Sequence, residues 1–318
     1  WQTYYEQLDY QCNWFATAAN YLSHKYEWNL LYVQIHIHDG INHLILNKLY
    51  PSSPKYDEKE ASVYWERMGM TYTYCDKMIE KIIKTCADEN TVIAIVSDHG
   101  ALPTFKMAWV GVPLIREGLL HFKNKDGGKL QIDWSKTKVY PWRTYLWVNL
   151  KGREPHGIVE PGEEFEKVRE KTINALYNMK DPETSECPIA LVLKKEDAVV
   201  LGQWGDRVGD LVYYLKPGYT DVDVDRNRVL EMPLEKILSL KDVEETEQVC
   251  AHHQYLPTAK LPPFSNAGIF IIKGPGVKKG HIRSNPCWTI DVVPTLAYIL
   301  GIKPPDSVEG RVLWDIIL

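Results

Sequence analysis

Two apolar segments of this chain are each followed directly by an aspartate and a histidine. The segment Leu30–His38 leads into Asp39-Gly-Ile-Asn-His43, and the segment Thr91–Val96 leads into Ser97-Asp-His-Gly100. Short apolar runs that end at turn residues are typical of buried strands. In an open parallel sheet, ligands bind where the strands end. The pattern therefore predicts an α/β protein with polar ligands gathered at one edge of a mostly parallel sheet.

Helices and strands alternate over the first hundred residues. Apolar spacing predicts a helix over Trp1–His24 and a long helix that Asp57 caps and Asn90 ends. Residues 105–247 differ, with strands expected at 144–150, 189–193 and 210–215 and a helix at 163–179. A strand at 267–272 and a helix at 290–300 follow. We therefore predict a core in two parts, residues 1–104 and 248–318, with an inserted α+β subdomain at residues 105–247.

Composition excludes some classes of protein. The net charge of −5 argues against a nucleic-acid scaffold, which usually needs a basic face. No apolar stretch is long enough to span a bilayer. No pair of cysteines has the C-x-x-C spacing, so we expect reduced cysteines and a cytoplasmic protein. The six cysteines are Cys12, Cys75, Cys86, Cys187, Cys250 and Cys287.

The aspartates and histidines at the two segment ends are candidate metal ligands. If a helix begins after Leu30–His38, Asp39 and His43 lie on the same face of it. The turn at Gly100 allows Asp98 and His99 to point the same way. Asp and His ligands without Cys suit zinc or manganese in a catalytic site. The alternative for the first pair is an ordinary turn with a histidine at the edge of the core.

A later pair of histidines, His252 and His253, supplies one more imidazole ligand. Two cations held about 4 Å apart clamp the attacking and leaving oxygens of a displacement at phosphorus. The sequence therefore predicts two divalent cations, Zn²⁺ in the first place and Mn²⁺ as the alternative.

These motifs together resemble the alkaline phosphatase superfamily, in particular its type I phosphodiesterase and nucleotide pyrophosphatase branch. Downstream of the two aspartate–histidine motifs, the resemblance rests on four segments. They are His252-His-Gln-Tyr-Leu-Pro-Thr258, Gly274-Pro-Gly-Val-Lys-Lys-Gly280, Asp291-Val-Val-Pro-Thr295 and Gly301-Ile-Lys-Pro-Pro-Asp306 with Glu309-Gly310. Their order and spacing extend over almost the whole chain.

The resemblance implies an α/β/α sandwich and a two-metal hydrolase that forms a phospho-enzyme intermediate. By matching position, Asp39, His43 and His252 would hold one cation, and Asp98 and His99 the other. Family members usually read His-Gly at the late position, where this chain has two histidines. His252 is chosen by its distance from Leu256-Pro257, and His253 stays an alternative.

The chain departs from the family pattern at its start. The first aspartate of the second metal site and the Thr or Ser nucleophile lie on an earlier strand and helix in the family. Nothing before Asp39 supplies them, and Ser97 has no obvious base. We therefore expect the nucleophile upstream of Trp1 or on an amino-terminal fragment that completes the site. The alternative is a non-catalytic or split-enzyme subunit that retains a metal half-site.

The substrate that the resemblance implies is a small phosphate ester or a nucleotide. A phosphomutase or a sulfatase relative is the alternative reaction class. Aromatic side chains of the inserted region could stack on a nucleotide base, although burial in the subdomain core is the reading we prefer. These side chains are Trp142, Tyr145, Trp147, Trp204 and Tyr213.

Overall fold

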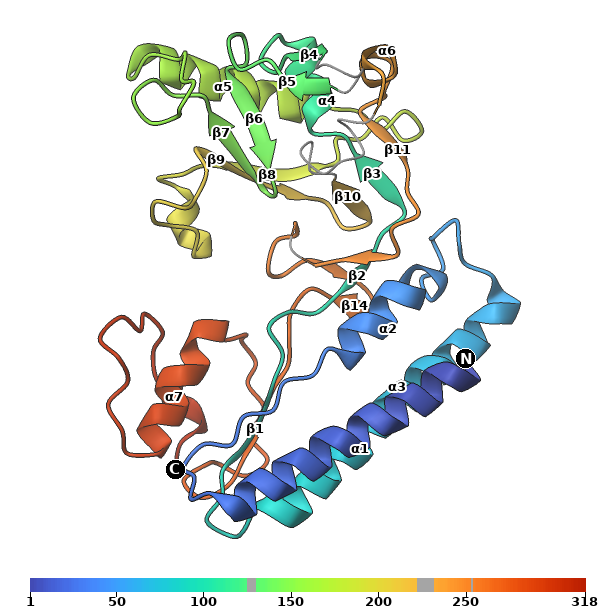
Figure 1. Cartoon of the computed structure of the whole chain (residues 1–318), viewed down its shortest axis with the longest axis vertical. Coiled ribbons are helices and arrows are strands. Elements are labelled where there is room, and N and C mark those ends of the chain that lie inside the picture. The colour runs from blue at the N-terminus through green and yellow to red at the C-terminus, as the bar shows by residue number, and fades with distance from the viewer. Residues whose placement is uncertain (125–129, 222–231, 253) are drawn as a thin grey trace. The chain divides into compact units, whose positions relative to one another are not determined.

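The computed structural model describes residues 1–124, 130–221, 232–252 and 254–318 of the chain (Figure 1). The chain divides into two compact units. Unit 1 comprises residues 1–38, 66–100 and 268–318, and unit 2 comprises residues 39–65 and 101–267. The predicted insertion, residues 105–247, lies wholly within unit 2. The boundaries that we predicted for it stay predictions.

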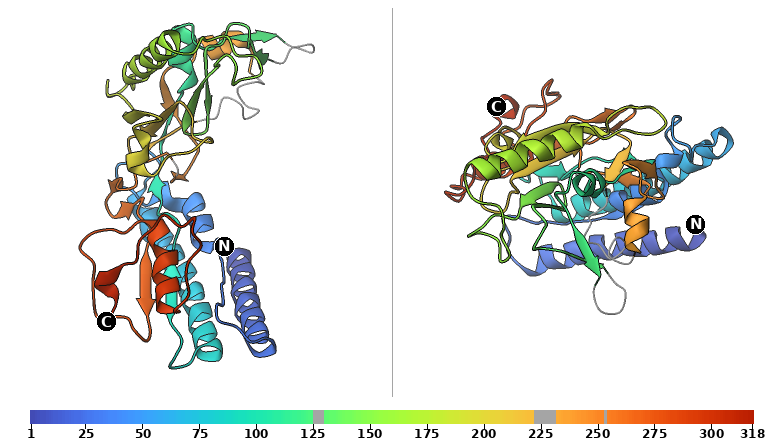
Figure 2. Two further views of the ribbon diagram at one scale, coloured as in Figure 1. Left: turned by 90° about the vertical axis from the view of Figure 1, so that its left-hand side faces the viewer. Right: turned by 90° about the horizontal axis from the view of Figure 1, so that it is seen from above.

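Two long helices pack together in unit 1. Helix α1 covers Gln2–Lys25 and helix α3 covers Glu58–Cys86, and the two lie side by side in Figures 1 and 2. Leu8 and Cys12 of α1 are buried against Cys75 and Met78 of α3. Asp57 precedes α3, and its Oδ1 accepts hydrogen bonds from the amides of Lys59 and Glu60. Both predicted helices and the predicted cap are confirmed, but α3 ends at Cys86, before the predicted end at Asn90.

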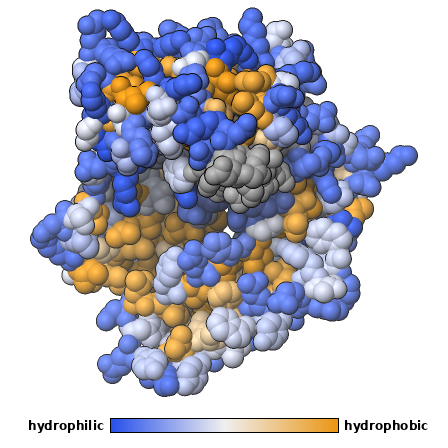
Figure 3. Space-filling view, turned by 45° about the horizontal axis from the view of Figure 1, so that its top comes forward, coloured by the Kyte–Doolittle hydropathy of each residue, from blue (hydrophilic) through white to orange (hydrophobic). Residues whose placement is uncertain are grey.

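The strands of unit 1 differ from the prediction. Strand β1 (Ile93–Val96) pairs antiparallel with β15 (Phe270–Lys273). The mostly parallel sheet that we expected is therefore not seen there. Among the described strands, β1 and β15 pair only with each other, and their residues Val96 and Ile271 are 41% and 56% exposed. On the face drawn in Figure 3, hydrophobic side chains reach the surface among hydrophilic ones.

The strand predicted at Leu30–His38 is wrong. Residues 30–36 have no regular structure, and helix α2 already begins at Ile37. Every second residue is still exposed, from Leu30 to His36, so the side chains alternate as in a strand. A strand also needs a hydrogen-bonded neighbour, and the described part of the chain places none beside this segment.

The remaining elements of unit 1 lie near its carboxyl end. They are the 3₁₀ turn η3 (Thr289–Asp291), helix α7 (Val292–Ile299) and the 3₁₀ turn η4 (Trp314–Ile316). Asp291 is buried, and its carboxylate accepts hydrogen bonds from the amides of Trp288 and Arg311. The Asp-x-x-Pro-Thr motif noted in the sequence thus ties α7 to the segment that follows it.

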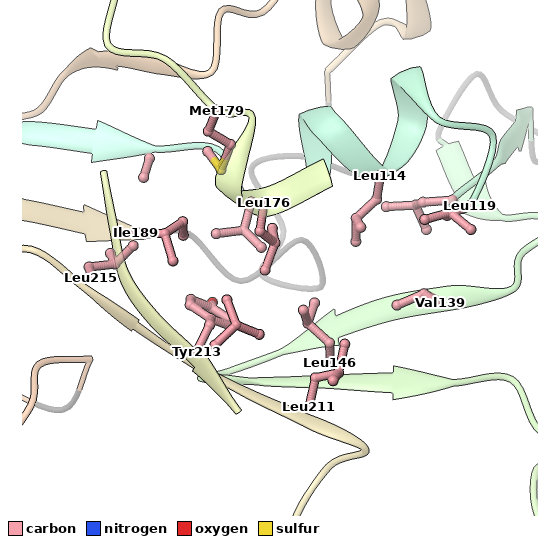
Figure 4. Close-up of a cluster of buried hydrophobic side chains, with 14 of the residues drawn as sticks. Leu114, Leu119, Val139, Leu146, Leu176, Met179, Ile189, Leu211, Tyr213 and Leu215 are labelled. Carbon is pink, nitrogen blue, oxygen red and sulfur yellow. The ribbon is translucent and has the colours of Figure 1, made fainter. Parts of the chain in front are cut away.

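Unit 2 is built around an antiparallel sheet of four strands in the order β6-β7-β9-β8. The strands are β6 (Val139–Trp142), β7 (Tyr145–Val148), β8 (Ile189–Lys194) and β9 (Leu211–Leu215). Helix α5 (Glu163–Tyr177) and the shorter helix α4 (Gly111–Arg116) bury leucines against it (Figure 4). The strands and the helix predicted in this region are confirmed.

Smaller strands complete unit 2. Strand β3 (Lys106–Ala108) pairs in parallel with β10 (Tyr219–Asp221) and antiparallel with β11 (Val243–Glu245). Short antiparallel pairs join β2 (Leu102–Pro103) with β12 (Cys250–Ala251), β4 (Phe122–Asn124) with β5 (Leu130–Ile132), and β13 (Lys260–Leu261) with β14 (Phe264–Ser265). The short helical elements are α2 (Ile37–Ile45), η1 (Leu46–Lys48), η2 (Ala198–Leu201) and α6 (Leu234–Leu238). The chain is thus an α/β protein, as predicted.

Candidate metal centre

Helix α2 brings Asp39 and His43 together. Ile41 and Ile45, on the opposite face of the helix, are fully buried and anchor it in unit 2. Asp39 lies in the first turn, where the positive end of the helix dipole favours a carboxylate. His43 follows four residues later, one turn along the same face. Its Nε2 lies 3.4 Å from Oδ1 of Asp39, as the spacing predicted.

His252 joins this pair from a distant part of the sequence. It follows strand β12 directly, and the antiparallel pairing of Cys250 with Pro103 holds that strand in place. The Nε2 of His252 lies 3.9 Å from Oδ1 of Asp39. The rings of His43 and His252 are 5.8 Å apart and inclined by 75°. Two imidazole nitrogens therefore face one carboxylate oxygen. His253, the alternative ligand, lies outside the described residues.

Asp39 is the centre of this arrangement: it offers a donor atom within 4.8 Å of one of His252, and His43 lies beside it. Oδ1 of Asp39 is buried and accepts no hydrogen bond in the described part of the chain. A buried carboxylate oxygen without a partner is costly, so a cation beside it would stabilise the site. A tetrahedral zinc ion separates its oxygen and nitrogen ligands by about 3.3 Å. The 3.4 Å and 3.9 Å separations around Asp39 are close to this value.

A cysteine that the sequence analysis did not assign to the site contacts His43. The Sγ of Cys250 lies 3.3 Å from Nδ1 of His43, and Cys250 is fully buried. Burial, with a smaller contribution from the Asp39 carboxylate, raises the pKa of the Cys250 thiol to about 12. The available signal was its position two residues before His252, because alternate residues of a strand share a face.

Asp98 and His99 lie in unit 1, directly after β1. The Nδ1 of His99 donates a hydrogen bond of 2.7 Å to the carbonyl of Gly100, which leaves the lone pair on Nε2. This Nε2 lies 3.4 Å from Oδ2 of Asp98, whose side chain is 84% exposed. The two neighbouring side chains therefore point toward each other, but the bend lies at Asp98 and Gly100 has no positive φ, so the turn predicted at Gly100 is not the cause. The pair thus offers one carboxylate and one imidazole nitrogen.

The hydroxyl of Ser97, which precedes this pair, has a structural role. Its Oγ accepts a hydrogen bond of 2.7 Å from the amide of Ile269. A Cβ added at Gly268 would lie 2.6 Å from the same oxygen. The close approach of the chain before β15 therefore requires glycine there, and Ser97 Oγ serves as a fixed acceptor.

The aromatic residues of the inserted region differ in burial, and Tyr145 and Trp147 are half-buried. Tyr213 is buried in the core of unit 2, and its hydroxyl donates to the carbonyl of Arg143. Trp142 and Trp204 are 45% and 58% exposed. Packing in the core accounts for Tyr213, as we preferred. Trp142 and Trp204 stay candidates for contact with a substrate.

Comparisons with known proteins agree with these motifs. Residues 3–246 match the family described as type I phosphodiesterase / nucleotide pyrophosphatase. His252 lies beyond the matched residues. No curated protein matches the chain in sequence.

Two solved structures resemble the chain. One is the alkaline phosphatase PafA, with 14% identity, a TM-score of 0.41 and coverage of 88% of this chain. The other is a PafA variant with four substitutions, with 15% identity, a TM-score of 0.47 and coverage of 81% of this chain. The chain spans 46% of the length of each. Among the described residues, no helix combines the length and the apolar character that crossing a membrane requires.

Proposed function

Because the chain belongs to the type I phosphodiesterase / nucleotide pyrophosphatase family, we propose that it carries metal ligands of a phosphoric ester hydrolase. The observation that carries this proposal is the buried Oδ1 of Asp39, which accepts no hydrogen bond from the described residues, with the Nε2 atoms of His43 and His252 beside it. The donor set of one carboxylate and two imidazoles is that of a catalytic zinc site with an open position.

Two cation sites are proposed. Asp39, His43 and His252 hold one divalent cation, and Asp98 and His99 contribute to the second. Zn²⁺ suits the nitrogen-rich first site best, and Mn²⁺ is the alternative because carboxylate ligands accept it. A bound cation of this kind supplies a Lewis acid that withdraws charge from phosphoryl oxygens.

The residues of the chain prepare these sites in three ways. The carboxylate of Asp39 supplies a negative charge, which offsets part of the charge of a cation. The helical spacing orients His43, and the hydrogen bond to Gly100 sets the tautomer of His99, so that each presents one nitrogen. The buried isoleucines of α2 fix the helix that carries two of these groups. A site fixed before the substrate arrives needs no reorganisation during the reaction.

The proposed substrate is a small phosphate ester or a nucleotide, which transfers its phosphoryl group to a hydroxyl nucleophile and then to water. We place the nucleophile outside residues 1–318, in keeping with the engaged hydroxyl of Ser97. An amino-terminal segment or fragment would supply it.

The test is hydrolysis of a model phosphodiester by the native protein and by the variants Asp39→Ala and Asp98→Ala. Each variant removes one proposed ligand, so we expect losses of at least about 100-fold in kcat/KM. The matched control is Asp57→Ala, which removes a carboxylate that caps α3. This control should lose about 1 kcal/mol of stability and retain its activity.

Each alternative has its own result. Full activity of Asp98→Ala would remove that residue from the site. Zn²⁺ binding without turnover, even when an amino-terminal fragment is added, would favour a non-catalytic subunit. Preferred turnover of a sulfate ester, or transfer of phosphate within a sugar phosphate, would favour the sulfatase or phosphomutase reading.

A further inference from the structure

We infer that Cys250 is the positioning residue of His43. Its sulfur holds Nδ1 of the imidazole and thereby directs Nε2 toward the cation. This inference rests on the proposed metal site and adds a residue that does not itself bind the metal.

The two nitrogens of His43 have different partners. Nε2 lies 3.4 Å from Oδ1 of Asp39, and Nδ1 lies 3.3 Å from Sγ of Cys250. The ring is therefore held between a carboxylate and a sulfur. A histidine that binds a metal through Nε2 carries its proton on Nδ1 and donates it to a neighbouring group, which fixes the ring. In the loaded protein, Nδ1–H of His43 therefore donates to Sγ.

The position of the sulfur is set by a strand. Cys250 is fully buried, and its backbone pairs with Pro103 of β2. The side-chain amide of Gln248 also donates to the carbonyl of Cys250, at 3.0 Å. The side chain of His43, in contrast, is 42% exposed and needs a fixed neighbour to hold one orientation.

Strand β12 and the residue that directly follows it serve two ligands. Cys250 contacts His43, and His252, two residues later, faces Asp39. Residues two apart along a strand lie on the same face. A displacement of β12 would therefore move the ligand His252 together with Cys250, which supports the ligand His43.

A direct role of Cys250 as a metal ligand does not agree with this geometry. A cation near Asp39 Oδ1 lies on the Nε2 side of the ring, whereas Sγ lies at Nδ1. Sulfur and cation are thus on different sides of the imidazole. The proposal predicts no sulfur-to-metal bond.

The experiment measures the Zn²⁺ affinity of the 318-residue chain by competition with a chelator. Cys250→Ala should weaken binding by about 10- to 100-fold, because it removes the group that holds the ligand. Cys250→Ser keeps an acceptor and should restore most of the affinity. The matched control is Cys187→Ala, which removes a thiol of unit 2 that contacts the carbonyl of Leu176 and should change nothing.

Two spectroscopic measurements separate positioning from a merely structural role. In the zinc-loaded native protein, the ¹⁵N-labelled His43 should show a proton on Nδ1 that exchanges slowly with water. The Cys250→Ala variant should lose this protection. The Co²⁺-loaded protein should show no thiolate charge-transfer band.

The possible failures can be told apart. A charge-transfer band that Cys250→Ser abolishes would make Cys250 a ligand and overturn the inference. Equal Zn²⁺ affinity of the native chain and of Cys250→Ala would overturn it as well. If Asp39→Ala also leaves the affinity unchanged, the metal site itself fails. If Cys250→Ala does not fold, two other measurements test the inference. They are the exchange protection of the His43 Nδ1 proton in the native protein and the Zn²⁺ affinity of Cys250→Ser.

Discussion

At the scale of the residue, the role of each side chain in the candidate site depends on which of its atoms accepts a hydrogen bond. The Oγ of Ser97 accepts from Ile269 in a contact that Gly268 makes possible. Oδ1 of Asp39, in contrast, is buried without a hydrogen-bond partner in the described part of the chain. Both oxygens neighbour candidate ligands in the sequence. The difference in their contacts indicates a structural role for the hydroxyl and a binding role for the carboxylate.

We predict that Ser97→Ala leaves hydrolysis of a phosphodiester within a few-fold of the native rate. The substitution removes one acceptor of a backbone amide, so the free energy of unfolding should fall by about 1 kcal/mol. Steady-state kinetics and urea unfolding check the two parts. A loss of activity by several orders of magnitude, with stability retained, would instead make Ser97 the nucleophile.

At the scale of the element, unit 2 holds its smaller strands together by a buried ion pair. Lys106 of β3 is the parallel partner of Tyr219 of β10. Both side chains converge on Asp181, which is 1% exposed, with Nζ at 2.6 Å and the hydroxyl at 2.8 Å from Oδ2. The amide of Glu183 donates to its other oxygen. One carboxylate thus joins two strands to the turn after α5.

The pKa values of this cluster give its pH dependence. Burial opposes the charge of Asp181, but hydrogen bonds from Lys106, the Glu183 amide and Tyr219 outweigh it and lower the pKa of Asp181. Burial also opposes the charge of Lys106, yet Asp181 and Glu183 raise the pKa of Lys106.

The stability from Asp181 is therefore present above its unfolded pKa, near 4, and is lost as the pH falls through its lower folded pKa. The stability from Lys106 is present below about pH 10.4 and is lost as the pH rises through its folded pKa.

We predict that Asp181→Asn lowers the free energy of unfolding at pH 7 by about 3 kcal/mol, because a largely buried Lys106 loses its main partner. The variant should also lose part of the stability increase that we expect of the native chain as the pH rises from the lowered folded pKa of Asp181 to its unfolded pKa, near 4. Urea unfolding at a series of pH values measures both effects. The matched control is Glu183→Gln, on the exposed partner of the same lysine, for which we expect a change of less than about 1 kcal/mol.

At the scale of the whole molecule, the first metal site depends on chain segments that are far apart. Asp39 and His43 come from the first segment of unit 2 and His252 from the second. These donors meet only when unit 2 is folded. A cation that binds the folded site and not the unfolded chain therefore stabilises that fold.

We predict that Zn²⁺ at 100 times its dissociation constant raises the free energy of unfolding by about 2.7 kcal/mol. Urea unfolding with and without Zn²⁺ checks this, and a chelator should reverse the gain. The Asp39→Ala variant should gain much less at the same Zn²⁺ concentration. An equal gain in both proteins would indicate that Zn²⁺ binds elsewhere.

The sequence by itself determined the α/β class, the long helices, the three strands β7, β8 and β9 of unit 2, and the helical spacing of Asp39 and His43. These features follow from local periodicity and from the one-turn spacing within a helix, which need no distant partner. The family resemblance also followed from the order of the motifs. Local order was therefore sufficient for the elements and for two of the candidate ligands.

Only the tertiary structure decided which strands pair and what surrounds each ligand. Residues 30–36 have a strand-like sequence, but no strand of the described residues is hydrogen-bonded to them, and β1 meets β15 in the antiparallel direction. The approach of His252 to Asp39 and of Cys250 to His43 depends on β12 pairing with β2. Such contacts join residues about two hundred positions apart, and no local pattern encodes a hydrogen bond across that distance.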